Sequence, residues 1–366
     1  MTLDDLRRFA VSRSLFTPVT LQRAIEKLGF VQADPIRAPA RAQDLTLRHR
    51  VKGYQAGDLE RRYARLPIEE DVLVNYGFVS SQVHALMHPR TKSTLSEAPR
   101  TRTDKLLAFV RERGDVHPRD VDAHFSHGTV TNYWGGSSNA TTQLLEHLHY
   151  RGWLRVARRE RGIRIYAFRE NPAAADGGSP RQRVDALVDV VVNKYAPLPA
   201  LSLSYAVRRL RYAVPQWRGH LNGALARARE RLAHERVDGI DWYWPPFAEA
   251  TGGRLAGERA YTPVADTVRL LAPFDPVVWD RRRFELFWGW PYRFEAYTPA
   301  AKRKCGYYAL PMLWRDRVIG WGNLSIDKGT LRSEFGYVAS TAPRDRTFTR
   351  ELEAELERFR IFLLPH

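Results

Sequence analysis

Two polar side chains near the amino terminus have the types and spacing that hydrolytic chemistry needs. Gln32 and Asp34 stand two residues apart in Phe30–Pro35, a short, partly β-branched stretch that a proline ends. We predict a strand here, and residues two apart on a strand project from the same face. A carboxylate there can take a proton from water and stabilise positive charge, while the amide orients the water or binds a substrate group.

The same letters also have a purely structural interpretation. An aspartate directly before a proline often begins an Asx turn, in which its side chain accepts a backbone N–H further along. Gln-x-Asp is a common tripeptide, so by itself it favours that turn. The chemical interpretation therefore depends on what the rest of the chain contributes.

The charge balance points to a polyanionic partner. The 366 residues include 58 Lys and Arg against 41 Asp and Glu, which gives a net charge of +17. This surplus attracts a polyanion through counterion release, and nucleic acid is the partner it favours. An anionic membrane surface is the rival, but no segment approaches the roughly 18 continuous apolar residues of a membrane span. Genomic bias toward arginine, or a need for solubility, is the alternative explanation of the positive charge.

Cysteine and histidine usage indicates a reducing compartment and no metal centre. Cys305 is the only cysteine, so neither an internal disulfide nor a cysteine-rich zinc site can form. The close histidine pairs, His124 with His127 and His147 with His149, follow no metal-ligand pattern of high specificity. The acidic start lacks the features of a signal peptide. We predict a cytoplasmic protein with no metal and no cofactor.

The first segment, residues 1–96, opens with helical patterns. Apolar residues recur at helical spacing over residues 3–10 and again over residues 19–28, where Gly29 supplies a C-terminal stop. The predicted strand with Gln32 follows. We expect a first winged helix that carries the Gln-x-Asp motif.

The second segment, residues 97–170, is the clearest unit. We predict helices over residues 104–113, 118–125 and 139–151, the last beginning at an asparagine suited to an N-cap. Two alternating strands over residues 153–168 then flank a Glu-Arg-Gly turn. Three helices followed by a two-stranded wing is the winged-helix order.

The predicted wing is strongly basic. From Arg151 to Arg169 there are seven arginines and one acidic residue. Such a wing suits contact with a phosphate backbone, and a solvated hairpin face is the alternative. The arginines expected to contact DNA are Arg155, Arg158, Arg159, Arg161 and Arg164.

Residues 171–180 are rich in Ala, Gly and Pro and are predicted to be a flexible linker. Residues 180–258 then repeat the helix-and-hairpin order more loosely, and residues 237–244 resemble a second small wing around an Asp-Gly turn. We expect a third winged helix. Its predicted helices cover residues 184–195, 202–210 and 220–233.

The last segment, residues 259–366, changes to alternating apolar and polar residues. We predict an antiparallel β-barrel or sheet, closed by a helix over residues 349–364. The chain is thus expected to be an α+β protein of tandem winged-helix (helix-turn-helix) domains followed by a C-terminal antiparallel β-barrel or sheet. The predicted strands cover residues 294–297, 306–313, 317–324 and 331–338.

Two sets of side chains in this segment have a second interpretation at a DNA surface. Lys302, Arg303 and Lys304 form a cationic cluster that either binds phosphates or lies in a solvated loop. Three tryptophans invite base stacking, although aromatics in a strand-rich domain are more often core. They are Trp279, Trp288 and Trp290.

Four stretches resemble the YcaQ/AlkZ-like winged-helix DNA glycosylases, a family that repairs interstrand crosslinks. The likeness is strong at residues 270–281 and 302–311 and weaker in the middle of the chain. It implies three winged-helix units and a β-barrel around duplex DNA. We expect Asp34 to be the base and electrostatic partner and Gln32 the positioning residue. The four stretches are residues 28–36, 48–54, 270–281 and 302–311.

The resemblance implies a monofunctional glycosylase for N7-alkylated purines, including the anchored base of an interstrand crosslink, in base-excision repair. Cutting an N-glycosidic bond builds positive charge on the sugar, and a carboxylate such as Asp34 stabilises that charge. An N7-alkylated purine is already cationic and leaves with little acid help, which fits a motif without a second carboxylate. No lysine pairs with the motif in sequence, so we expect no Schiff-base step. The expected partner is double-stranded DNA carrying alkylated bases, bound by a monomer.

Two stretches depart from this resemblance. Relatives often carry an acidic-aromatic stretch with a histidine, where this chain has residues 74–81 and no histidine until His84. Relatives often show Gly-Arg-x-Asp, where this chain has Gly-Trp-Gly-Asn at residues 320–323. Both changes put the substrate range in doubt. The Gln-x-Asp form points to the broader-substrate branch of the family.

Two other classes of function fit parts of the sequence. A non-enzymatic regulator built from tandem winged helices would explain the basic wing and the helix order. It would have no use for the Asp34 carboxylate facing DNA, because that charge repels phosphates. An RNA-acting enzyme is less favoured, because winged helices suit the grooves of duplex DNA.

Overall fold

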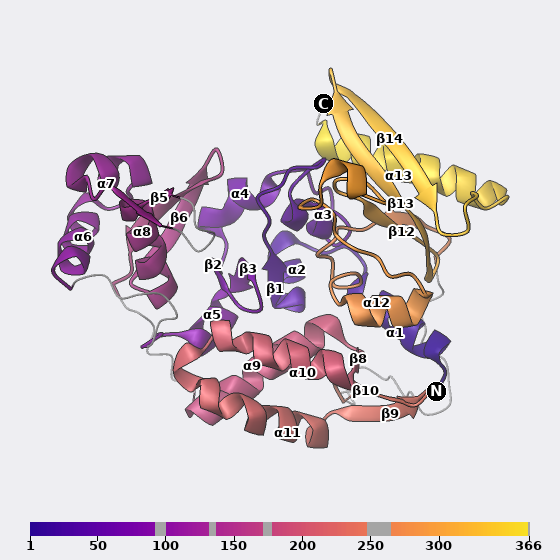
Figure 1. The fold of residues 1–366 in the computed structure, drawn as a ribbon, viewed down its shortest axis with the longest axis horizontal. Helices are drawn as coiled ribbons and strands as arrows, with labels where there is room; N and C mark the ends of the chain where they lie inside the picture. The colour runs from indigo at the N-terminus through magenta and orange to yellow at the C-terminus, as the bar shows by residue number, and fades with distance from the viewer. Residues whose placement is uncertain (92–99, 132–136, 171–177, 247–264, 365–366) are drawn as a thin grey trace. The chain divides into compact units, whose positions relative to one another are not determined.

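The structure is a computed structural model that describes residues 1–91, 100–131, 137–170, 178–246 and 265–364. The chain divides into two compact units, and Figure 1 labels many of the helices and strands of both. Unit 1 consists of Met1–Asp58, Asp189–Ala206 and Leu225–His366. Unit 2 consists of Leu59–Val188 and Val207–Ala224.

The amino-terminal part of unit 1 begins with two helices, as predicted. The second helix ends at Gly29, which has φ of 66° and would place a Cβ only 2.7 Å from Cγ1 of Val190. Both facts require glycine there, so the predicted stop is confirmed. The elements are α1 (Leu3–Ser14), α2 (Leu21–Leu28), β1 (Phe30–Gln32) and α3 (Ala42–Leu47).

A small antiparallel sheet of unit 1 has the strand order β8-β10-β9. The turn between β9 and β10 has positive φ at Asp238 and Gly239, 49° and 75°, as a type I′ turn requires. The hairpin predicted around this dipeptide is therefore confirmed. Its strands are β8 (Leu198–Pro199), β9 (Ala233–Val237) and β10 (Ile240–Trp244).

The helices predicted between residues 180 and 233 are also present. They are α9 (Pro180–Tyr195), α10 (Ala200–Arg209) and α11 (Leu221–Arg231), with the 3-10 helices η2 (Leu210–Tyr212) and η3 (Pro215–His220) between the last two.

The carboxy-terminal part of unit 1 is an antiparallel sheet that curls into a half-barrel, with the order β11-β12-β13-β14 (Figure 1). Its core holds Leu271, Val278, Phe284 and Leu313, all with no exposed surface. The elements are β11 (Val268–Leu270), α12 (Arg281–Trp288), η5 (Ala300–Lys302), β12 (Leu310–Trp314), β13 (Arg317–Asp327), β14 (Thr330–Tyr337) and α13 (Arg346–Leu363).

The strand predicted over residues 294–297 is wrong, because this stretch has no regular structure. Its alternation arises from a packed loop: the ring of Phe294 contacts Phe274, while the Glu295 carboxylate accepts two backbone N–H groups, from Lys304 and Cys305. The strand predicted from residue 306 begins only at residue 310.

Unit 2 contains the helices and the hairpin predicted for residues 104–168. The Asn139 side chain caps the last of these helices by accepting the N–H of Thr142 at 2.8 Å, as expected. A hairpin of β2 and β3 was not predicted. The elements are α4 (Asp58–Arg62), η1 (Tyr63–Arg65), β2 (Ile68–Val72), β3 (Tyr76–Ser80), α5 (Ser81–Met87), α6 (Arg100–Arg113), α7 (Pro118–Phe125), β4 (Thr129–Thr131), β5 (Ser137–Asn139), α8 (Ala140–Arg151), β6 (Leu154–Glu160) and β7 (Ile163–Phe168).

The mixture of helices with a C-terminal antiparallel sheet confirms the coarse fold class. The division into three winged helices at residues 97, 180 and 259 stays a prediction. Most of the linker predicted over residues 171–180 lies outside the described residues. Within the described residues, no helix is long and apolar enough to cross a membrane.

Candidate active site

Gln32 and Asp34 differ in how the chain holds them. Gln32 is the last residue of β1 and is 7% exposed. Asp34 lies beyond the strand, and its Oδ1 accepts the N–H of Ile36 at 2.9 Å, which makes an Asx turn. The Asx turn that the sequence also allowed is therefore present, and it uses one of the two carboxylate oxygens. Within the described residues no hydrogen bond reaches the other oxygen, Oδ2.

The surroundings of Asp34 make its carboxylate more basic than usual. The side chain is partly buried, and this burial raises its pKa, although the hydrogen bond from Ile36 opposes the shift. The backbone N–H of Asp34 donates to Oε1 of Gln43 at 3.4 Å, so the start of α3 helps to place it. A raised pKa suits a group that takes a proton from water.

Gln32 has a partner that lies 247 residues away. The Trp279 indole Nε1–H donates to Oε1 of Gln32 at 3.1 Å. The Trp279 ring stacks on Tyr195, with ring centroids 4.3 Å apart and ring planes 21° apart. The ring centroid of Tyr205, a half-exposed residue of α10, lies 6.1 Å from that of Trp279. Trp279 is thus not simply a core residue, and sequence reasoning missed its contact with the motif.

The loop that carries Trp279 is fixed by a buried ion pair. Asp275 accepts two hydrogen bonds from Arg50, at 2.7 and 2.9 Å, and both side chains are fully buried. Arg50 also donates to the carbonyls of Ser14 and Thr46, at 2.8 and 2.6 Å. This loop lies in residues 270–281, one of the four stretches that resemble the glycosylase family. Part of that stretch therefore holds Trp279 against Gln32.

The basic stretch around Arg48 is equally internal. Arg48 donates to Oε1 of Glu355 on α13 at 2.8 Å and lies 3.6 Å from the ring centroid of Phe359. His49 places Nε2 3.0 Å from the carbonyl oxygen of Leu270. Burial, and then the neighbouring arginines, hold the pKa of His49 well below its usual range. These side chains join the amino-terminal helices to the C-terminal sheet.

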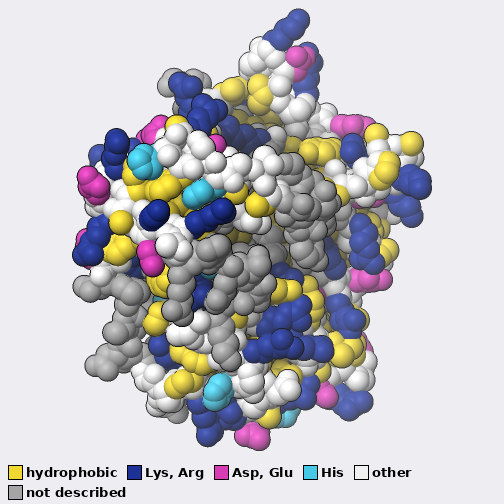
Figure 2. Space-filling view, turned by 60° about the vertical axis from the view of Figure 1, so that its left-hand side comes forward, with side chains coloured by type: hydrophobic (Ala, Val, Ile, Leu, Met, Phe, Trp, Pro, Cys, Tyr) yellow, Lys and Arg dark blue, Asp and Glu magenta, His cyan; other side chains and the backbone are white. Residues whose placement is uncertain are grey.

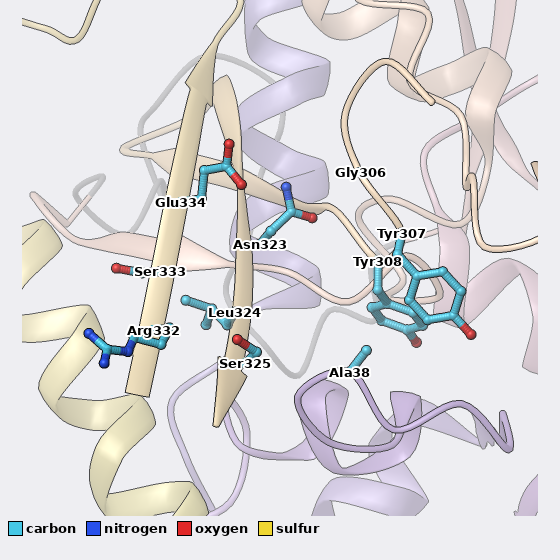
Figure 3. Close-up of a pocket in the computed structure, with 10 residues that line it drawn as sticks. All are labelled: Ala38, Gly306, Tyr307, Tyr308, Asn323, Leu324, Ser325, Arg332, Ser333 and Glu334. Atoms are coloured by element: carbon cyan, nitrogen blue, oxygen red, sulfur yellow. The ribbon is translucent and has the colours of Figure 1, made fainter. Parts of the chain in front are cut away.

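A cavity of about 470 Å³ opens beside β13 and β14 (Figure 3). Tyr308 lines it and is only 3% exposed, and its hydroxyl has no hydrogen-bond partner among the described residues. Burial, and then the negative charge of Asp34, raise the pKa of Tyr308 well above its usual range. Tyr308, which lines the cavity, is therefore close enough to Asp34 to be affected by its charge.

The cavity also holds a residue of the Gly-Trp-Gly-Asn stretch at positions 320–323. Asn323 lines the wall and donates from Nδ2 to the carbonyl of Cys305 at 2.7 Å. The adjoining Gly306 has φ of 116°, and a Cβ there would lie 2.5 Å from Asn323. The side chain of Asn323 therefore shapes the cavity rather than a distant surface.

The five predicted arginines of the wing fall into two groups. Arg155, Arg158 and Arg161 are exposed, although Arg158 also pairs with Glu160 at 2.7 Å. Arg159 donates to the buried Glu70 at 2.6 Å, and Arg164 lies 3.8 Å from the same carboxylate. The charges of this second group are largely balanced inside unit 2.

The predicted cationic cluster lies in unit 1, the unit that holds Asp34. Lys302 and Lys304 are exposed. Arg303 donates to the carbonyl of Thr298 at 2.8 Å and lies 5.0 Å from the ring of Tyr307, which also lines the cavity. Figure 2 shows basic side chains spread over much of the face that it displays.

One cluster in unit 2 contains residue types that bind metals. Asp71, His84 and His88 place ligand atoms within 4.8 Å of one another, and the two histidines stand four residues apart at α5, a spacing that sequence reasoning missed. Asp71 already accepts hydrogen bonds from His88 at 2.6 Å and from the buried Arg90 at 2.8 Å. A cation would lie beside the Arg90 guanidinium and be repelled by it, so we interpret the cluster as an internal charge network.

The family pattern described as DNA glycosylase AlkZ-like matches residues 25–362, a range that includes Gln32, Asp34, Trp279 and Tyr308. The chain therefore belongs to the AlkZ-like DNA glycosylase family, which confirms the resemblance and supports a DNA substrate. Among solved structures, the Streptomyces sahachiroi DNA glycosylase AlkZ is similar over 100% of this chain and 98% of its own, with a TM-score of 0.64 and 15% identity. At that identity the likeness shows a shared fold.

Proposed function

We propose that this protein hydrolyses the N-glycosidic bond of N7-alkylated purines in duplex DNA, with Asp34 as the general base and Gln32 as the positioning residue. One observation carries the proposal: a partly buried carboxylate of raised pKa lies two residues after a buried amide in a chain of a DNA glycosylase family. A non-enzymatic DNA-binding regulator is not favoured, because the family is one of glycosylases.

The reaction follows from the charge of the substrate. The C1′–N9 bond breaks and its electron pair passes to the purine, which neutralises the cationic ring, so the leaving base needs no proton. Positive charge develops on the sugar and is stabilised by the Asp34 carboxylate. Water adds to C1′ and gives its proton to Asp34. Oδ2 is the acceptor that the geometry favours, since Oδ1 is engaged by the N–H of Ile36.

Binding of the duplex would use the accessible cations. The exposed side chains of Arg155, Arg158 and Arg161 are suited to phosphate contacts, as are Lys302 and Lys304. Arg159 and Arg164 would contribute less, because both are close to the buried Glu70 carboxylate. Removal of the anchored base of an interstrand crosslink, by a single chain, is the further part of this proposal.

The test measures release of 7-methylguanine from an alkylated duplex. Asp34→Asn keeps the Asx turn, because an amide oxygen also accepts the N–H of Ile36, but removes the base. We expect it to lower the rate by about 10²-fold or more and to leave duplex binding equal or tighter. Asp241→Asn, at a partly exposed carboxylate of the same unit, is the matched control. Unchanged release by Asp34→Asn would disprove the mechanism.

A further inference from the structure

The contact between Trp279 and Gln32 determines the orientation of the amide. A side-chain amide carries one oxygen that accepts and one NH₂ group that donates, whereas an indole N–H can only donate. Because Trp279 Nε1 lies 3.1 Å from Oε1 of Gln32, the oxygen must face the indole. The NH₂ group of Gln32 is thereby turned to the opposite side of the amide.

Trp279 is itself held in place from two directions. Its ring stacks on Tyr195, the last residue of α9, and the carbonyl of Tyr195 accepts a hydrogen bond from the buried Arg283. Asp275, four residues before Trp279, is fixed by its buried pair with Arg50. A donor held this firmly can impose an orientation on the flexible side chain that it contacts.

The other end of β1 is anchored by the same helix. The Lys194 ammonium donates to the carbonyl of Phe30, the first residue of β1, and Lys194 adjoins Tyr195 at the end of α9. The carboxy-terminal turn of α9 therefore holds the main chain of the strand at Phe30 and, through Trp279, the side chain at Gln32. Both contacts lie within unit 1.

We propose that Trp279 is a positioning residue, which fixes the Gln32 amide as a hydrogen-bond donor toward the reacting nucleotide. This inference rests on the proposed function and says which side chain of its site donates a hydrogen bond and which accepts one. Asp34 supplies an acceptor and Gln32 a donor, and this pair is complementary to a water molecule that is to lose a proton. The donor meets an oxygen lone pair, while the carboxylate meets a hydrogen, so the remaining lone pair can be aimed at C1′.

A double-mutant cycle tests this role with Trp279→Phe, Gln32→Ala and the pair. Phenylalanine keeps a ring against Tyr195 but removes the N–H. We expect Trp279→Phe to lower kcat about fivefold to tenfold, with duplex affinity changed by less than about twofold. In the Gln32→Ala background the same change should alter kcat by less than about twofold. Equal losses in both backgrounds, or a loss of duplex affinity, would show that Trp279 acts by packing or by stacking on a base.

A second readout does not depend on catalysis. The indole proton of Trp279 gives a resonance in the ¹⁵N–¹H spectrum, and its hydrogen bond to Gln32 should slow its exchange with solvent. Gln32→Ala should accelerate that exchange, while Asp241→Asn should not. Unchanged exchange in Gln32→Ala would overturn the positioning role even if the wild type is active. If Gln32→Ala accelerates the exchange but the wild type releases no base, the contact between Trp279 and Gln32 is retained and only the proposed function is rejected.

Discussion

Two basic triplets of unit 1 look alike in sequence and have opposite surroundings. Arg48, His49 and Arg50 lie inside, where Arg48 pairs with Glu355 and Arg50 with Asp275. In the other triplet, Lys302, Arg303 and Lys304, both lysines are exposed. A run of positive charge therefore indicates either a buried connector or a surface for phosphates, and only the carboxylates brought to it by distant segments distinguish the two.

The comparison predicts its largest effect at Arg50. Arg50→Met leaves the Asp275 carboxylate buried without its partner, which should cost about 3–5 kcal/mol of stability. Urea unfolding, followed by fluorescence and circular dichroism, measures the shift of the midpoint. Arg50→Lys keeps the charge without the paired hydrogen bonds and should lose less. If Arg50→Met lowers the free energy of unfolding by less than about 1 kcal/mol, the Arg50–Asp275 pair does not hold the amino-terminal helices to the C-terminal part of unit 1.

The internal triplet also predicts how stability depends on pH. His49 has a depressed pKa in the folded state, so the unfolded chain binds a proton more readily. The free energy of unfolding should therefore fall as pH drops below about 6.5, by up to about 1.4 kcal/mol per pH unit for this residue. Unfolding at a series of pH values, compared with His49→Gln, measures the contribution. Equal slopes for the two proteins would exclude it.

The smallest effect on stability is expected at the external triplet. Lys302→Ala with Lys304→Ala should change the free energy of unfolding by less than about 0.5 kcal/mol. If both lysines contact phosphates, the negative slope of log affinity against log salt should become shallower by about 2, with little dependence on the DNA sequence. Arginine at both positions, which keeps the charge, is the control. An unchanged slope would show that the two lysines lie in a solvated loop and do not contact phosphates.

Much of the secondary structure could be predicted because its signals are local. Asn139 as an N-cap, Gly29 as a helix stop and the Asp238-Gly239 turn each depend on a few neighbouring residues, and the structure contains all three. The failed strand over residues 294–297 shows the limit, because a period of two cannot distinguish a strand from a loop with one packed aromatic ring.

The candidate site was predicted only in part, for a related reason. Gln32 and Asp34 are close in sequence, so the chemistry proposed for them could be predicted from the sequence. Trp279 and Tyr308 lie more than two hundred residues further along the chain. Nothing near them in the sequence indicates that Trp279 donates to Gln32, or that the charge of Asp34 helps to raise the pKa of Tyr308. Gln43 gave no signal at all, since its contact is with a backbone N–H.

The Asx turn at Asp34 restricts which changes this position can tolerate. One oxygen shapes the backbone at Ile36, and the other is the proposed proton acceptor. A longer side chain such as glutamate would carry a similar base but displace it from the short turn. Asparagine would preserve the turn and lack the base. Under the proposed mechanism neither substitution keeps both roles: glutamate would alter the loop, and asparagine would give a correctly folded protein without its base.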